Sequence, residues 1–89
     1  MTKNKSLASI KAMLEVADIG YSSLLKLAEA NSTSITEIPN SHYRLTELKR
    51  VTENLLKEFV EPLTAEEFEE QNHAVALLNA VNSALNSYT

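Results

Sequence analysis

The chain has 89 residues, 44% of them hydrophobic and 22% charged, and its lack of cysteine excludes disulfides, thiolate metal sites and thiol chemistry. Its net charge of −4 is uneven: residues 1–50 carry seven basic and five acidic side chains and residues 51–89 carry one and seven, so we expect no nucleic-acid surface. No apolar run is long enough to span a membrane, and the first residues lack the apolar core of a signal peptide, so we expect a single cytoplasmic domain.

Residues 7–30 have the spacing of one long helix. Apolar or small residues alternate there at steps of three and four: Leu7, Ile10, Leu14, Ala17, Tyr21, Leu24 and Ala28. This heptad spacing predicts that one face of the helix packs against other helices. The spacing continues through Gly20 without a slip, so we expect a continuous helix, although Gly costs about 1 kcal/mol relative to Ala in a helix.

A second group of small and apolar residues lies on another side of this helix. Ala12, Val16 and Ile19 are roughly 150° around the axis from the heptad face, where a helix of a lone three-helix bundle usually meets water. Two interpretations remain open. Either this patch contacts another protein or a second copy, which is the hypothesis we favour, or the following connection covers it through Ile35 and Ile38.

The connection, residues 31–43 (NSTSITEIPNSHY), is rich in residues that favour turns and caps. Ile35 and Ile38 are expected to anchor it to the core, and Ser34 with Glu37 would cap one short helical turn. A second helix then follows over residues 42–60, ended by Pro62, which cannot continue a helix. Its buried positions are predicted to be Leu45, Leu48, Thr52, Leu55 and Phe59.

A third helix is predicted over residues 65–87, and it has the clearest start signal. Thr64 and Glu67 have the spacing of a capping box, and Leu63 and Phe68 that of a hydrophobic staple. The expected buried face is Ala74, Leu77, Leu78, Val81, Leu85 and Tyr88. Together the three segments predict an all-α fold, an antiparallel three-helix bundle whose first connection has room for a short extra helical turn.

The stretch from His42 to Ala80 (HYRLTELKRVTENLLKEFVEPLTAEEFEEQNHAVALLNA) resembles a family of small helical proteins from enteric bacteria, known as a domain of unknown function. The likeness is one of overall sequence, without a catalytic motif. It implies a bacterial cytoplasmic protein and brings no activity, cofactor or site residue with it.

Two groups of residues could carry chemistry. Glu70 and His73 form a Glu-x-x-His step, which on a helix can place two metal ligands side by side, but helical di-iron sites need two such steps and the chain has one. His42 and Tyr43 could exchange protons, yet no nucleophile stands in a recognisable context beside them. We therefore expect neither an enzyme nor a bound cofactor.

The most consistent prediction is a protein that acts by contacting another protein or itself. The candidate contact residues are Ala12, Val16, Ile19, Ile35, Ile38, His42 and Tyr43. The alternative is a small helical protein that binds a metal or another ligand through the acidic cluster around Glu70 and His73.

Overall fold

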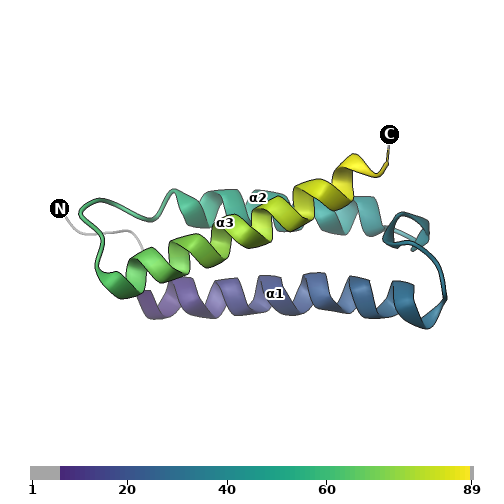
Figure 1. Cartoon of the computed structure of the whole chain (residues 1–89), viewed down its shortest axis with the longest axis horizontal. Helices are drawn as coiled ribbons and strands as arrows, with labels where there is room; N and C mark the ends of the chain where they lie inside the picture. The colour runs from purple at the N-terminus through teal and green to yellow at the C-terminus, as the bar shows by residue number, and fades with distance from the viewer. Residues whose placement is uncertain (1–6, 89) are drawn as a thin grey trace.

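The computed structural model describes residues 7–88 and forms the predicted antiparallel three-helix bundle. Its elements are the helices α1 (Leu7–Ala30), α2 (Ser41–Leu56) and α3 (Ala65–Asn86), with a single 3-10 turn, η1 (Ile35–Glu37), between the first two. In Figure 1, α1 and α3 run in the same direction and α2 runs in the opposite one. Every helix contacts the other two, and η1 is the short extra turn for which the sequence left room.

Helix α1 is one helix through Gly20, as the heptad spacing predicts. Its buried positions all belong to the predicted seam: Ile10, Leu14, Ala17, Leu24 and Ala28. Tyr21, in the same seam, is half-buried, and its hydroxyl donates a hydrogen bond to the Ala80 carbonyl of α3 at 3.5 Å. The seam therefore forms the core surface of α1 and leaves the rest of its circumference for other contacts.

The end of α1 is a Schellman motif centred on Ser32, which has a positive φ of 50°. The Ser32 amide donates to the Glu29 carbonyl at 3.1 Å and the Thr33 amide to the Ala28 carbonyl at 3.0 Å, and this pair of bonds defines the motif. Glycine is the usual residue at this position because it adopts positive φ without steric cost. The motif reverses the chain toward η1.

The first connection is anchored in the core by isoleucines, as predicted. Ile38 is only 6% exposed and Ile35 packs against the core while remaining partly exposed. The predicted cap of the short turn was wrong, because the Ser34 side chain does not cap η1; its hydroxyl pairs instead with the Thr36 hydroxyl at 2.7 Å.

Helix α2 ends at Leu56, four residues before the predicted end at residue 60. The amides of Lys57, Glu58 and Phe59 each donate to the carbonyl three residues earlier, so the chain tightens into turns instead of continuing the helix. This early exit gives the connection enough length to reach α3, and Phe59 still packs against the core.

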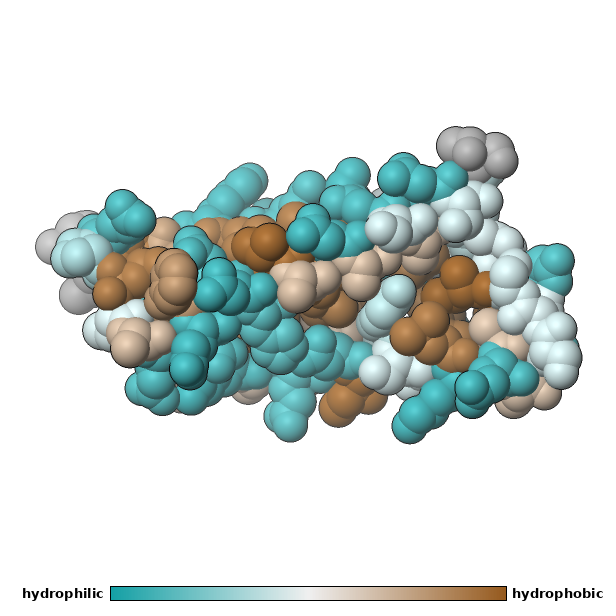
Figure 2. All heavy atoms as spheres, viewed as in Figure 1, coloured by the Kyte–Doolittle hydropathy of each residue, from teal (hydrophilic) through white to brown (hydrophobic). Residues whose placement is uncertain are grey.

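Helix α3 begins with the predicted capping box. The Thr64 hydroxyl accepts a hydrogen bond from the Glu67 amide at 3.1 Å, and the Glu67 carboxylate accepts one from the Thr64 amide at 2.9 Å. The hydrophobic staple is weaker than predicted, because Phe68 remains 55% exposed. In Figure 2, apolar side chains reach the surface at the end where the chain passes from α2 to α3. The small bundle thus leaves part of its apolar surface in water.

Candidate interaction surface

An apolar groove lies between α1 and α2. One part has a volume of about 440 Å³ and is lined by Ala12, Met13, Val16, Ala17, Gly20, Leu48 and Val51. A second part, of about 370 Å³, shares Gly20, Leu48 and Val51 and extends to Tyr43 and Arg44. We call the two parts together the α1–α2 groove. Because aliphatic side chains form most of its walls, it suits another aliphatic surface better than a polar ligand.

Gly20 forms the floor of the groove where α1 and α2 approach each other. A Cβ atom built on Gly20 would lie 3.4 Å from Cδ2 of Leu48, an ordinary van der Waals contact. The missing side chain therefore leaves a hollow beside Leu48 about one methyl group deep. Gly20 is therefore part of the groove surface as well as part of helix α1.

The predicted patch on α1 borders this groove and lies in water. Val16 is 70% exposed and Ile19 60% exposed, and Ala12 is exposed as well. The alternative that the first connection covers the patch is wrong, because Ile38 is buried in the core and Ile35 packs against that core. No part of residues 7–88 buries Val16 or Ile19, so the patch is accessible to another molecule.

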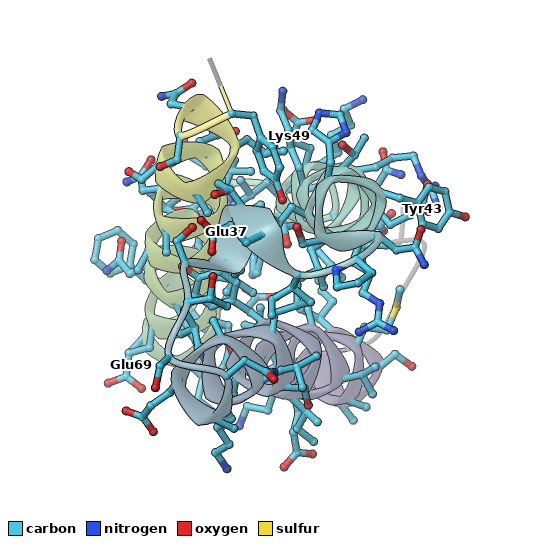
Figure 3. All side chains as sticks on the ribbon, turned by 90° about the vertical axis from the view of Figure 1, so that its right-hand side faces the viewer. Glu37, Tyr43, Lys49 and Glu69 are labelled. Atoms are coloured by element: carbon cyan, nitrogen blue, oxygen red, sulfur yellow. The ribbon has the colours of Figure 1, made fainter. Side chains whose placement is uncertain are left out.

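The remaining predicted contact residues divide between two places. Tyr43 is 67% exposed, lines the groove and in Figure 3 points outward from α2. His42 is exposed, but its ring and that of Tyr88 form a T-shaped pair, with ring centroids 4.9 Å apart and planes at 86°. Tyr88 also hydrogen-bonds the buried hydroxyl of Ser41. His42 thus belongs to the junction of α2 and α3, whereas Tyr43 belongs to the groove.

The opposite flank of α1 differs from the groove because polar contacts join it to α3. Lys11 Nζ lies 3.0 Å from the Glu66 carboxylate, and His73 Nε2 lies 2.7 Å from Asp18 Oδ2. The hydrogen bond to Glu66, together with the charge of that carboxylate, raises the pKa of Lys11 above its ordinary value. One side of α1 is therefore joined to α3 by polar pairs, while the other side presents aliphatic groups.

Glu70 and His73, the residues of the Glu-x-x-His step, have separate surroundings in the structure. His73 pairs with Asp18 of α1, and Glu70 is a partly exposed member of the acidic first part of α3. In Figure 3, Glu69 of the same acidic run points away from the bundle. Within residues 7–88 there is no group of three or more His, Asp or Glu side chains placed to hold a metal ion.

Sequence reasoning missed part of this surface, although its spacing is visible in the chain. A second series of small and apolar residues alternates at steps of three and four along α1, and we call it the second seam: Met13, Val16, Gly20, Ser23, Leu27 and Ala30. Four of its members line the groove, and Leu27 is exposed further along the helix. The opposing Leu48 was predicted as a buried position, and only the packing of α2 shows that Leu48, together with Val51, also forms a groove wall.

Comparisons of the chain with protein-family models, with curated proteins and with solved structures find no match. Within the part of the chain that the structure describes, no helix has the length and apolar character needed to cross a bilayer.

Proposed function

We propose that this protein acts by binding another protein chain through the α1–α2 groove and the adjoining side of α1. The observation that carries this proposal is the 70% exposure of Val16 and 60% exposure of Ile19 beside a groove with aliphatic walls. Single exposed apolar residues are common on proteins, but a continuous apolar surface usually marks a contact.

The chemistry of the groove favours a helix with an apolar face as its occupant. Helix-in-groove recognition places side chains at steps of three and four into an aliphatic trough. Fully burying a Val or Ile side chain contributes about 1.5–3 kcal/mol, so covering Val16 and Ile19 would be a large part of a binding energy. Arg44 and Glu47 at one end of the groove would form the polar rim that surrounds most interfaces.

The outer face of α2 is polar, in contrast to the apolar side of α1, and it supplies a control surface for the same chain. Glu53, Asn54 and Lys57 are all exposed there. Of the exposed large aliphatic residues of α1, Met13, Val16, Ile19 and Leu27 share this side of the helix, whereas Leu25 and the exposed Val60, Phe68 and Val75 lie elsewhere on the bundle. The contact we propose needs no cofactor or catalytic group, and we place it in the cytoplasm, where a protein without cysteines is unaffected by reducing conditions.

Site-specific photo-crosslinking in the native cell tests this function. A benzophenone amino acid replaces Val16 in one variant and Glu53, on the outer face of α2, in a matched control. We expect a discrete adduct from position 16 and none from position 53. Equal labelling from both positions, or no adduct from position 16, would contradict binding through this surface.

A further inference from the structure

We propose that the chain occupying this surface is a second copy of the same protein, with the two α1 helices packed antiparallel about a two-fold axis. This inference rests on the proposed function, since it names the partner for the same groove. It follows from the spacing of the second seam, the charges beside it and the area available.

The second seam gives α1 two packing faces. Its six residues follow the heptad spacing over residues 13–30, and their mean direction lies about 120° around the helix from the buried seam. The buried seam contacts α2 and α3 within the chain. A helix with a second heptad seam is expected to pack against one more helix, and within residues 7–88 no helix remains to fill that place.

The second seam is complementary to itself in the antiparallel orientation. With the axis between residues 20 and 23, Gly20 meets Ser23 of the second copy and Val16 meets Leu27 of the second copy. The layers on the axis then contain the smallest side chains, which lets the two backbones approach closely. The layers further out contain aliphatic groups that are exposed in the single chain.

The charges beside the second seam favour the antiparallel orientation over the parallel one. Glu15 and Lys26 are both exposed on the same flank of α1, and within the described residues neither has an ion-pair partner. In the antiparallel arrangement Glu15 of each copy lies near Lys26 of the other, so two opposite-charge pairs form. A parallel two-fold arrangement would instead place like helix dipoles side by side and would put Glu15 of one copy and Lys26 of the other on opposite sides of the interface.

The available area matches the need of a stable dimer. Standard interfaces bury about 800 Å² on each partner. Helix α1 has 24 residues and is therefore about 36 Å long. The bundle is 18–23 Å across, so a full side of the bundle along α1 measures about 650–830 Å² in projection, and an interface of standard size would take up most of that side.

Single cysteines test the arrangement directly, because the chain has no cysteine of its own. Ser23 and Ser22 are adjacent exposed serines, but only Ser23 belongs to the second seam. Two copies of Ser23 would lie nearly opposite each other across the axis, within disulfide reach. We expect S23C to form a disulfide dimer about tenfold or more faster than S22C under the same mild oxidant. Equal rates would overturn the proposal.

The orientation has its own cysteine test. In the antiparallel register the two copies of Val16 are about 16 Å apart along the helices, whereas Val16 faces Leu27 of the second copy. We therefore expect V16C alone not to crosslink, and a mixture of V16C and L27C to give the mixed disulfide. Rapid crosslinking of V16C with itself would show a parallel pair and overturn the orientation.

Charge reversal gives an independent test without touching the apolar residues. We expect E15K, and separately K26E, to weaken self-association about tenfold, and the combined variant E15K/K26E to return within about threefold of the wild type. Failure of the combined variant to recover would contradict the paired charges.

The failure of this inference can be told apart from failure of the proposed function. A photo-adduct from position 16 with twice the chain mass supports the second copy. An adduct with a different protein, together with equal oxidation of S23C and S22C, overturns the dimer and keeps the groove as a binding surface. No adduct from position 16 contradicts both.

Discussion

Replacing Gly20 with alanine separates the role of this residue in the helix from its role in the groove. Alanine is favoured over glycine by about 0.8–1.0 kcal/mol inside a helix. The added Cβ would lie 3.4 Å from Leu48 Cδ2, which is ordinary contact and brings no steric cost. We therefore expect Gly20→Ala to raise the free energy of unfolding of the single chain by about 1 kcal/mol.

Urea unfolding followed by far-ultraviolet circular dichroism measures this change. With a denaturant slope of about 1–3 kcal/mol per molar urea, the midpoint should move up by about 0.3–1 M at a protein concentration too low for association. The corresponding rise in melting temperature is about 4–8 °C for a domain of this size.

The same variant should lose part of this gain when the protein is concentrated. A methyl group at the closest layer of the proposed dimer separates the two helices, so the stabilisation that association adds to the wild type becomes smaller. A net destabilisation of Gly20→Ala at low concentration would show that α1 and α2 leave no room for a Cβ. An equal gain at low and high concentration would refute the placement of Gly20 in a contact surface.

Three further substitutions test the local structure by urea unfolding. Thr64→Ala removes the hydroxyl that caps α3 and should cost about 1 kcal/mol, and an unchanged midpoint would contradict the capping box. Tyr88→Phe leaves the hydroxyl of Ser41, which is 1% exposed, without its partner and should lower the free energy of unfolding by about 1–3 kcal/mol. Adding Ser41→Ala should cost little more, because the buried hydroxyl is then gone as well. Strictly additive losses would mean that the two hydroxyls do not act as a pair. Ser32→Gly relieves positive φ and should stabilise by about 0.5 kcal/mol after the entropy cost of glycine, and a loss of stability would argue against the Schellman motif.

Features set by neighbouring residues were predictable from the sequence. The heptad spacing of α1 predicted a continuous helix because burial repeats with the helix period. The structure confirms that the helix continues through Gly20. Thr64 and Glu67 predicted the start of α3 because a capping box needs only four consecutive residues. The isoleucines of the first connection were correctly expected in the core, because they are the large apolar side chains of a segment otherwise rich in polar turn-forming residues.

Features that depend on how the helices meet were not predictable in the same way. Pro62 correctly indicated an end to α2 but not its position, because the exit at Leu56 is decided by the path to α3. The α1–α2 groove arises where Leu48 meets the bare backbone of Gly20, and the periodicity of either helix alone does not show this. The exposure of Val16 likewise depended on where the first connection packs, a choice that the sequence left open.

Sedimentation equilibrium over a range of roughly 10 µM to 1 mM tests the central claim, that α1 is the contact surface for a second copy. The wild type is compared with Val16→Glu/Ile19→Lys and with Glu53→Lys/Lys57→Glu on the outer face of α2, and both double variants leave the net charge unchanged. We expect the wild type and the outer-face variant to rise from the 9.9 kDa of one chain toward twice that mass.

The α1 variant should remain at 9.9 kDa at every concentration while its circular dichroism shows full helix content. A wild type that stays at the mass of one chain throughout, or an α1 variant that associates as strongly as the wild type, would contradict the account.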